Sequence, residues 1–397
     1  MTASLLISGA GIAGLSAALA LSRAGVRVDV LERSPDLSTE GAGVQLGPNV
    51  TRILRSWGLQ DGLNAMAFFP QHLCAHDARD GRVMGQAALG SAAQRYGAPH
   101  VCIHRADLQT LLWQAAQAQP HVHWHWGQTL QNVKQDAGLV SVCSAAGQSW
   151  QADGLVVADG IGSALRRSLF GDGAATPTGH LALRALLPMA DVPAVWRTGN
   201  VHVWMGEHFH VVHYPVRAGQ WLNLVLVLHR PDMAMAQDQW SLHSDGAWAQ
   251  QAVSHSCSAL RDLVGAVAQW RYWMLAERAP LGSAQEMAVG RIALMGDAAH
   301  PMRPYLAQGA GMAIEDAAAL QWAWQTQGNL GVCAAWQAMA HSRWQRVAQV
   351  QKQSRRNGRI FHSTGLLRWG RNVALQTWGP DLMDPSWLYG GGPMPMA

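Results

Sequence analysis

The stretch SLLISGAGIAGLSAALALSRAGVRVDVLER, residues 4–33, decides the fold. SLLISGA predicts a short buried strand, GLSAALALSRAG a helix that closes at Gly25, and VRVDVLER a second strand. A strand, a helix and a strand in this order predict a βαβ unit, which is the start of a parallel α/β sheet.

Three glycines and one acid in this stretch predict a ligand. Gly9, Gly11 and Gly14 are spaced as GxGxxG between the first strand and the helix, and Glu32 ends the second strand. The glycines permit a tight turn that brings backbone N–H groups against a pyrophosphate at the helix N-terminus, and the acid can bind both ribose hydroxyls of an adenosine. The motif predicts dinucleotide binding but does not separate NAD from FAD, and a strand–helix joint packed for structure only is the alternative.

Composition and charge limit the classes of protein to consider. Of 397 residues, 49% are apolar and 14% are charged, which suits a globular protein of two packed domains. The 29 Lys and Arg against 25 Asp and Glu give a net charge of +4 without a basic stripe, so we expect no nucleic-acid partner. Five scattered cysteines without a CxxC pair favour a reducing, cytoplasmic location and argue against a disulfide framework.

Two further stretches suggest functions that their surroundings argue against. The apolar N-terminus lacks the basic region of a signal peptide, and its glycines interrupt the run, so we expect no targeting segment and no membrane span. His121, His123 and His125 share one strand face and raise the possibility of a metal site. No fourth ligand or carboxylate accompanies them, so we expect a solvated strand and no metal.

The middle of the chain differs in texture from its flanks. Helices are predicted at GPNVTRILRSWGL and RADLQTLLWQAAQ, and a buried strand at QADGLVVADG that ends at Asp159. Between residues 178 and 275, the segments LALRALLPM, VHVWMG, HFHVVHYPV and WLNLVLVLHR read as strands joined by hairpins. The sequence therefore predicts an antiparallel sheet inserted into the α/β domain, with helices after it.

Two later segments help to decide which dinucleotide the glycine motif binds. They read VVADGIGSALRR at residues 156–167 and GDAAHPMRPYLAQGAGMAIED at residues 296–316. With the N-terminal GAGIAG, they resemble in order the three fingerprints of the class A flavoprotein monooxygenases, and the resemblance covers nearly the whole chain. It implies a Rossmann-like FAD-binding domain over residues 1–177 and 275–372, a substrate-binding β-sheet domain over 178–274, and a C-terminal tail over 373–397.

The resemblance also implies where FAD binds. Asp297 would hydrogen-bond the ribityl chain, and the loop 300–305 would lie beside the flavin ring. The helix that begins near Gly309, Ala310 and Gly311 would bring bare backbone and a positive dipole to the pyrimidine end of that ring. The other implied contacts are Gly9, Gly11, Gly14 and Glu32 of the first motif, Arg33 at the adenosine, Arg105 near the pyrophosphate, Leu130 at the adenine, and Asp159 at a motif linked to FAD and NAD(P)H.

Within the class, the nearest pattern that we recognise is that of the 6-hydroxynicotinate 3-monooxygenases, through GAGVQLGPNV, LALRAL, the GD loop and DPSWLYG. Their pocket histidines are replaced here by Gln45 and Tyr305, and a pocket cysteine by Val201, whereas His210 and Tyr214 match. Residues 210 and 214 share one strand face, so a His and a Tyr facing a flavin could orient and deprotonate a ring hydroxyl. The alternative is that His210 is an ordinary histidine of a sheet.

The activity implied by the resemblance is a hydroxylation. FAD would be reduced by NADH or NADPH and would form a hydroperoxide with O2, whose oxygen enters a hydroxylated aromatic or N-heteroaromatic ring, often an acid. His210 and Tyr214 are the predicted catalytic residues, and Gln45, Val201 and Tyr305 complete the substrate site. The alternatives are a flavin oxidoreductase without oxygen insertion, an epoxidase on a non-aromatic substrate, and a catalytically silent flavin-binding protein. We expect a monomer or a homodimer.

Overall fold

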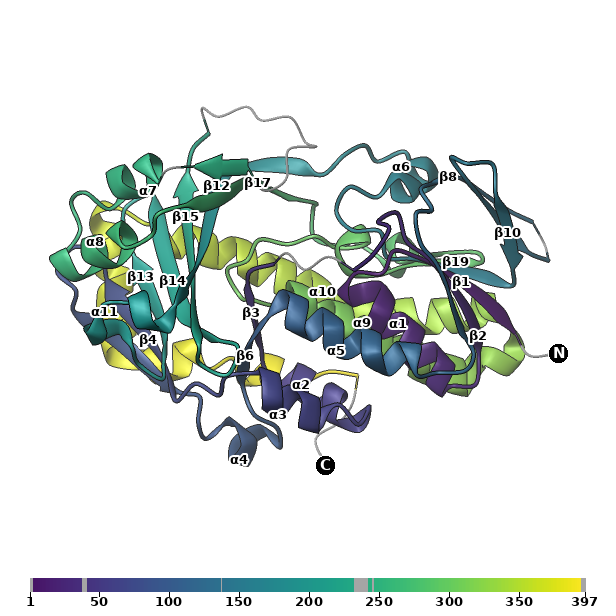
Figure 1. Cartoon of the computed structure of the whole chain (residues 1–397), viewed down its shortest axis with the longest axis horizontal. Coiled ribbons are helices and arrows are strands. Elements are labelled where there is room, and N and C mark those ends of the chain that lie inside the picture. The colour runs from purple at the N-terminus through teal and green to yellow at the C-terminus, as the bar shows by residue number, and fades with distance from the viewer. Residues whose placement is uncertain (1–2, 38–40, 137, 232–241, 245, 394–397) are drawn as a thin grey trace.

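The computed structural model describes residues 3–37, 41–136, 138–231, 242–244 and 246–393, and it contains two large sheets joined by helices (Figure 1). One sheet has six strands and the other has eight. The predicted fold class is confirmed: a parallel α/β core is joined to an antiparallel sheet, and helices follow. Among the described residues, no helix combines the length and the apolar character that a bilayer span requires.

The six-stranded sheet grows from the βαβ unit predicted at the N-terminus. Its strands run in the order β18, β19, β11, β1, β2, β7, and all neighbours are parallel except the pair β18 and β19. Leu5 and Ile7 pack toward the helices, whereas Leu6 packs toward a small antiparallel sheet. Both faces are thus covered, which explains why these strands are continuous apolar runs. The strands are β1 (Ser4–Ser8), β2 (Arg27–Leu31), β7 (Val122–His125), β11 (Gly154–Val157), β18 (Ala288–Val289) and β19 (Ile292–Leu294).

Helices cover one face of this sheet, and a three-stranded sheet covers the other. Helix α1 packs between α5 and α9, and α10 packs on α9. The strand that carries His123 and His125 ends at His125, because Gly127 turns the chain from β7 into the small sheet. These elements are α1 (Ile12–Arg23), α5 (Arg105–Gln117), α6 (Ala164–Phe170), α9 (Gly309–Gln327), α10 (Val332–Phe361), β8 (Leu130–Gln135), β9 (Val140–Ser144) and β10 (Ser149–Ala152).

The eight-stranded sheet contains the predicted antiparallel strands and two others. Its order is β16, β17, β12, β15, β14, β13, β4, β5, and only the pair β13 and β4 is parallel. Strands β4 and β5 come from residues 72–88, far outside the range 178–274 expected for this sheet. The strands are β4 (His72–Asp77), β5 (Val83–Ala88), β12 (Thr176–Pro188), β13 (Val201–Met205), β14 (Phe209–Val216), β15 (Trp221–His229), β16 (Leu242–Ser244) and β17 (Trp270–Glu277).

The two faces of the eight-stranded sheet have different neighbours. Helices α7 (Ala247–Ala252) and α8 (Ser258–Gly265) cover its outer face, where Leu260, Leu263 and Val264 are buried. The other face lies toward the C-terminal end of α10, because Phe361 packs against the two buried clusters that contain Val203 and Val227. Helix α10 therefore spans from one sheet to the other (Figure 1).

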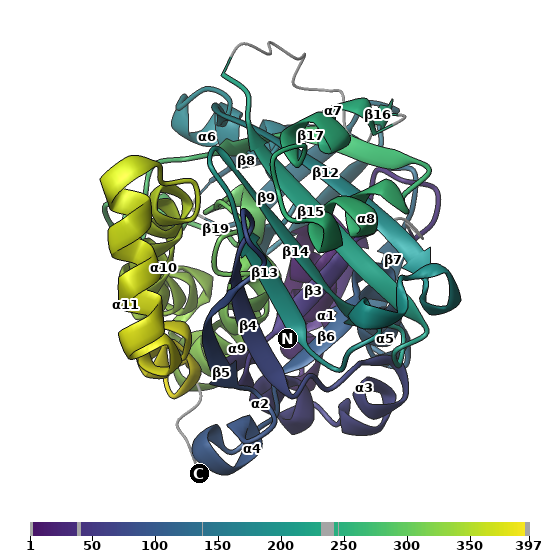
Figure 2. The same cartoon turned by 90° about the vertical axis from the view of Figure 1, so that its left-hand side faces the viewer.

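The end of the chain is more regular than the tail predicted over 373–397. Helices α11 (Gly365–Met383) and α12 (Ser386–Tyr389) occupy most of it, and residues 394–397 lie outside the described part of the chain. Helix α11 lies beside β5 at the outer edge of the molecule (Figure 2). The remaining elements are β3 (Gly43–Leu46), β6 (Val101–His104), α2 (Pro48–Ser56), α3 (Gln60–Met66), α4 (Ala92–Tyr96) and 3-10 turns that include η4 (Gly296–Ala298) and η5 (Gly328–Leu330).

Candidate functional site

The three glycines of the first motif serve two different purposes. A Cβ atom on Gly9 would lie 2.6 Å from the carbonyl oxygen of Ala158, and one on Gly14 would lie 1.8 Å from that of Gly9. A Cβ atom on Gly11 would meet nothing within 4 Å, and Gly11 has a φ of −74° that other residues can adopt. Gly9 and Gly14 are therefore required by packing, whereas Gly11 borders open space at the N-terminus of α1.

Glu32 lies at the end of β2 and holds the loops around it. Its carboxylate accepts hydrogen bonds from the N–H groups of Ala10, at 2.6 Å, and Ser34, at 2.7 Å. The N–H of Gln128 donates to the carbonyl of Glu32 at 2.7 Å, which brings the loop before Leu130 to the same place. Arg33 is exposed next to it. Each carboxylate oxygen keeps a second lone pair, so Glu32 can still accept from a ligand hydroxyl.

Asp159 lies just beyond β11, beside the first motif. Its Oδ1 atom is buried without a hydrogen-bond partner in the described residues. Burial raises the pKa of this carboxyl group to about 6, although Ser163 and the nearby Arg167 act in the opposite direction. A buried polar atom without a partner is costly, so this oxygen fits a ligand that donates to it.

Asp297 belongs to η4, and its loop touches the first motif. Gly296 has a φ of 56°, and a Cβ atom there would lie 2.8 Å from the Cβ atom of Ala13 in α1. The Asp297 side chain is accessible to solvent, yet protein surrounds it closely enough that burial raises the pKa of its carboxyl group, against the influence of His300 and Arg105. Because its carboxylate is accessible to solvent and is also surrounded by protein, Asp297 lines a recess in the surface. The structure thus brings Asp297, Arg105 and the N-terminus of α1 together.

The loop of Asp297 is anchored from behind by a buried ionic network. His300 Nε2 lies 2.6 Å from Asp316 Oδ2, which also accepts from the N–H of Gly296 at 3.1 Å, and Arg343 Nε donates to Asp316 Oδ1 at 2.9 Å. Burial opposes the charged form of Asp316, but His300 and Arg343 hold its pKa at about 2. This network fixes the backbone that carries Asp297.

A second carboxylate extends the network to α2. Glu315 accepts from Arg343 at 2.6 Å, from Arg346 at 2.7 Å and from Asn49 Nδ2 at 2.6 Å, and it is fully buried. Asn49 Nδ2 also donates to Gln308, the residue before α9, at 3.2 Å. The network therefore also positions the N-terminus of α9.

The N-terminus of α9 offers free donors. Met312 is the first residue whose N–H bonds back within the turn, to Gln308 at 2.8 Å, and the N–H groups of Gly309, Ala310 and Gly311 have no partner within the described part of the chain. A Cβ atom on Gly309 would meet nothing within 4 Å, whereas one on Gly311 would lie 2.8 Å from Gln308 Oε1. Gly309 borders open space, whereas a side chain on Gly311 would press on the movable end of the Gln308 side chain and on Val50 at 3.0 Å.

These features together fit an extended dinucleotide. Two helix N-termini with free N–H groups, at Gly11 and Gly309, flank the recess of Asp297, and the unpartnered Asp159 oxygen lies beside the first of them. Free N–H groups and the positive ends of helix dipoles favour a pyrophosphate and an electron-rich ring. The described residues therefore suit the predicted cofactor.

The predicted substrate residues divide into two groups on one face of β14. Tyr214 hydrogen-bonds Gln45, and both lie near Gly43, where a Cβ atom would be 2.6 Å from the Tyr214 ring. Val201 is buried in the same apolar cluster as Tyr214. Burial raises the pKa of Tyr214 well above its ordinary value.

His210 lies at the other end of this face. Its ring centroid is 5.0 Å from that of Tyr305 and 5.4 Å from that of Phe361, and its Nδ1 atom is 2.8 Å from His362 Nε2. Burial, with a contribution from His180, lowers the pKa of His210 to about 3, so its ring is neutral. The hydroxyl of Tyr305 is buried without a partner in the described residues.

The distance between the two groups follows from strand geometry. Tyr214 lies four positions after His210 on the strand, so their Cα atoms are about 13 Å apart at roughly 3.3 Å per residue. Their side chains can approach the two ends of one substituted ring but do not touch each other.

Sequence reasoning missed several residues of the site. Asp316 and Arg343 lie on helices whose pattern indicates only burial, His362 follows the last residue of α10, and the partners of all three are distant in sequence. The predicted His125 pairs with Asp29, Nε2 to Oδ1 at 2.8 Å, rather than facing solvent alone. No short sequence motif predicts any of these contacts.

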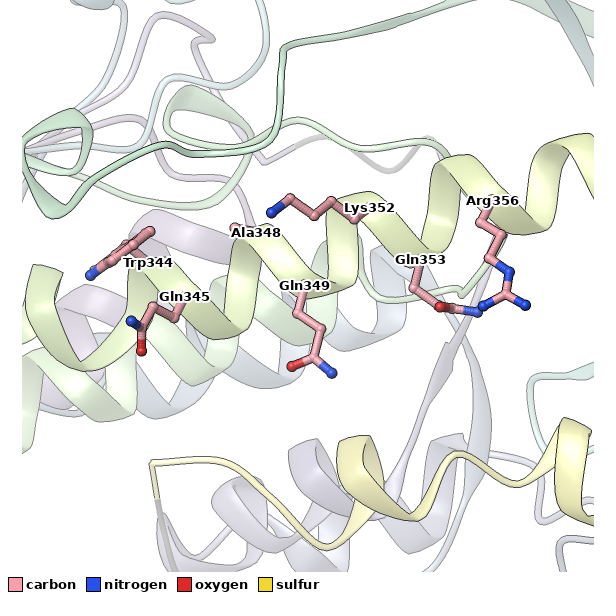
Figure 3. A pocket seen from close by; sticks show the side chains of 7 residues that line it. All are labelled: Trp344, Gln345, Ala348, Gln349, Lys352, Gln353 and Arg356. Atoms are coloured by element: carbon pink, nitrogen blue, oxygen red, sulfur yellow. The ribbon is translucent and has the colours of Figure 1, made fainter.

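A groove on the outer face of α10 lies apart from the candidate site (Figure 3). It has a volume of about 430 Å³ and is lined by Trp344, Lys352, Arg356 and, between them, Ala348 and three glutamines. None of the predicted site residues lines it.

Comparisons with known proteins agree with this geometry. Residues 2–329 match the family described as FAD binding domain. The chain is 35% identical to 3-hydroxybenzoate 6-hydroxylase of Polaromonas naphthalenivorans (strain CJ2) over 97% of this chain and 95% of that protein. It is 33% identical to 6-hydroxynicotinate 3-monooxygenase of Pseudomonas fluorescens over 97% of this chain and 94% of that protein.

Solved structures share the fold. A salicylate hydroxylase substrate complex superposes with a TM-score of 0.82 at 24% identity, over 98% of this chain and 96% of that one. Klebsiella pneumoniae HpxO complexed with FAD and uric acid superposes with a TM-score of 0.81 at 24% identity, over 96% of this chain and 97% of that one. The chain therefore belongs to the FAD-binding-domain family and, within it, to the aromatic-ring monooxygenases.

Proposed function

We propose that this protein hydroxylates an aromatic or N-heteroaromatic ring that already carries a hydroxyl group, with FAD as cofactor and NADH or NADPH and O2 as co-substrates. One observation carries the proposal. Tyr305 belongs to the loop that follows Asp297, and its ring lies 5.0 Å from His210 on the sheet. The predicted cofactor loop and the predicted substrate face therefore meet at this residue.

FAD would be held along the recess already described. Gly11 and the N-terminus of α1 would receive the pyrophosphate, with Arg105 near it, while Glu32, Arg33 and Leu130 would surround the adenosine. Asp297 would accept from the ribityl hydroxyls, and Gly309 and Ala310 would present N–H groups to the ring. When bound, FAD would supply the chemistry of accepting hydride from NAD(P)H and of activating O2, of which one atom enters the substrate and the other leaves as water.

His210 would act on the substrate hydroxyl through its Nε2 atom, because Nδ1 is occupied by His362. The low pKa of His210, about 3, keeps its ring neutral at physiological pH and makes it a weak base, so it would accept a hydrogen bond from the substrate hydroxyl and orient it. A hydroxyl group that donates a hydrogen bond in this way pushes more electron density into the ring, which makes the ring easier to hydroxylate. His362 would serve as a positioning residue that fixes which nitrogen of His210 carries its proton.

The other end of the ring would lie against Tyr214, Gln45 and Val201. The Gln45 amide can donate and accept, so it can recognise a polar substituent, whereas Val201 is fully buried and contributes an apolar wall. Sites that hydrogen-bond a substituent discriminate strongly against analogues without it. We therefore place the substrate's second polar group at this end.

The organisation of the chain is part of the proposal. We propose that residues 1–177 and 275–372 bind FAD and that residues 178–274 bind the substrate, together with β4 and β5, which pair with that sheet. We also propose a cytoplasmic location, which the scattered cysteines support.

The test is a substrate screen with product analysis. The purified, FAD-loaded protein would be mixed with NADH or NADPH and with hydroxylated aromatic acids, including 3-hydroxybenzoate and 6-hydroxynicotinate, the compounds named for its relatives. We expect faster NAD(P)H oxidation with one ring class and a product heavier by one oxygen atom, labelled from 18O2. A product without added oxygen would favour an oxidoreductase, and a response only to non-aromatic alkenes would favour an epoxidase.

A further inference from the structure

Solvent reaches one row of paired residues on the face of the eight-stranded sheet that carries His210. Every residue of β14 is buried except Val212, and Val225 is the only residue of β15 between its two ends that is not buried. Val212 pairs with Val225, and Val225 pairs with Arg184 of β12, which is half-buried as well. Directly paired residues point to the same face, so these three side chains form an accessible strip across three neighbouring strands (Figure 2).

The strip lies between the two groups of residues that we expect to bind the substrate. His210 and Tyr214 stand two positions before and two positions after Val212 on β14, so all three share one face. His210 and Tyr214 are only 3% and 4% exposed, so the accessible part of this face is the strip between them. An aromatic ring placed over Val212 and Val225 would therefore have His210 at one end and Tyr214 at the other.

The Arg184 side chain borders the strip on the side of β12. Its guanidinium carbon lies 5.0 Å from the ring centre of Trp273, so an aromatic face supports the cation. Burial lowers the pKa of His104, and Arg217 and Arg184 lower it further, which places the charge of Arg184 near β6. Strand β6 pairs with β3, the strand that carries Gln45. Arg184 therefore lies toward the end of the site that Gln45 occupies.

The charges around the strip favour an anionic ligand. Among the described residues of this row and of the rows on either side, Arg184 and Arg271 are cations and Asp77 is the one acid, which Arg368 binds at 2.7 Å. A guanidinium stays charged at every physiological pH, and its five N–H groups can serve several acceptors at once. A carboxylate accepts two parallel hydrogen bonds from such a group.

We propose that Arg184 binds the carboxylate of the substrate and restricts the site to aromatic acids. The ring would lie over Val212 and Val225, with its hydroxyl group at His210 and its acid toward Arg184 and Gln45. Two strand spacings, roughly 10 Å, separate Arg184 from Val212, so a carboxylate on a ring above Val225 comes within reach of the long Arg side chain. This inference rests on the function proposed above, because it takes His210 as the partner of the substrate hydroxyl.

The test compares ring acids with their neutral amides as ligands of the FAD-loaded protein. The probes are 3-hydroxybenzoate with 3-hydroxybenzamide, and 6-hydroxynicotinate with 6-hydroxynicotinamide, and calorimetry gives each dissociation constant. We expect the wild-type protein to bind at least one acid about tenfold or more tightly than its amide. In Arg184→Gln, the affinity for that acid should fall about 10- to 100-fold, the range for a lost hydrogen bond to a charged group, and that for the amide less than about threefold. Arg184→Lys keeps a cation without the planar fork, so it should retain part of the preference.

Arg55→Gln removes one positive charge at an exposed position of α2 and is the control, for which we expect wild-type affinities. Equal losses for acid and amide in Arg184→Gln would show that Arg184 only supports the sheet, and would overturn the proposal. A wild-type protein that binds the amides as tightly as the acids, or binds none of the four probes, would overturn it too. If Arg184→Gln does not fold, the Lys variant decides, and a wild-type ratio of acid to amide affinity in that variant contradicts the proposal.

Failure of the proposed function would look different. If the wild-type protein binds an acid selectively, Arg184→Gln loses that selectivity and no ring is hydroxylated, the role of Arg184 is supported and the reaction alone is wrong.

Discussion

Asp297 is the residue whose surroundings call most clearly for a ligand. Its carboxylate lies in a recess where burial disfavours the charged form and raises its pKa. His300 and Arg105 lower this pKa, but their influence offsets burial only in part. In the network behind this recess, Asp316 bonds the N–H of Gly296 and the ring of His300, which fixes the backbone next to Asp297. These bonds do not involve the Asp297 side chain. A donor from outside the protein therefore completes the site.

Asp297→Ala should weaken FAD binding by about 10- to 100-fold, the effect of losing a hydrogen bond of roughly 1.5–3 kcal/mol to a charged group. Titration of the apoprotein with FAD, followed by the change in flavin fluorescence, measures the dissociation constant. Asp262→Ala removes an exposed acid on α8 and should leave binding unchanged. Equal affinities in the two variants would show that Asp297 does not contact the cofactor.

His362→Phe should lower kcat by roughly tenfold, because His210 loses a hydrogen bond of about 1.4 kcal/mol that fixes its tautomer. In His362→Gln, the amide can restore a partner for His210 Nδ1, so a good part of the rate should return. The readout is kcat with the substrate found in the screen, with KM measured alongside. Equal rates in Phe and Gln variants would mean that His362 only fills space.

At the scale of single elements, the turn between β1 and α1 separates packing from ligand binding. Gly14 has no room for a Cβ atom, and Gly11 has ample room as long as no ligand is bound. The sequence motif treats both glycines alike, but the structure assigns them different purposes.

This difference can be measured with two alanine variants. Gly14→Ala should fail to fold or lose several kcal/mol of stability, because its Cβ atom would overlap the carbonyl oxygen of Gly9 at 1.8 Å. Gly11→Ala should fold normally as the apoprotein but bind FAD at least tenfold more weakly, since the methyl group occupies space needed by the pyrophosphate. Unfolding by urea and FAD titration are the two measurements. FAD affinity equal to wild type in Gly11→Ala would contradict the assignment.

Local sequence predicted some elements well and others not at all. The unit of residues 4–33 is specified by neighbours in sequence, so β1, α1 and β2 lie where expected. Strands β4 and β5 contain His, Cys, Gly and Gln and lack regular alternation, and they are strands because β13 pairs with β4. Helix α11 escaped prediction beyond residue 372 for a related reason, since its polar residues face inward.

At the scale of the whole molecule, buried histidines make stability depend on pH. Burial lowers the pKa of His100 and His180 to about 4 and that of His202 and His210 to about 3. The unfolded chain, with histidine pKa values near 6.5, binds more protons than the folded protein between these limits. Stability is therefore fully present above about pH 6.5 and declines as the pH falls. Asp159, whose pKa is raised, acts in the opposite direction as a single group.

We expect the free energy of unfolding of the apoprotein, measured with urea, to be lower at pH 5 than at pH 7 by several kcal/mol, at up to about 1.4 kcal/mol per histidine per pH unit. His213→Phe should reduce this dependence, because His213 is buried, its pKa is lowered well below the ordinary value by burial and by His202, and neither ring nitrogen has a partner in the described residues. His121→Phe, at an exposed position, is the control. Parallel pH curves for all three proteins would contradict this account.

The sequence predicted the architecture further than it predicted the site. Apolar runs, turn residues and glycine spacing are local signals, so the α/β core and the hairpins of the antiparallel sheet could be expected. Contacts such as Arg343 with Asp316, or His210 with His362, join helices and strands that are distant in sequence, and no local pattern encodes them. The resemblance to a family supplied residue positions, but not the supporting contacts.

The strand order of the six-stranded sheet has a consequence for biosynthesis. Strand β1 is flanked by β11, whose residues 154–157 are made much later, and β11 in turn waits for residues 292–294 of β19. Pairings this remote in sequence give a high contact order and slow folding. On the ribosome, most of the chain must emerge before this sheet can close, so the apolar strands at the N-terminus remain open to aggregation during synthesis, and early protection by a chaperone should raise the yield.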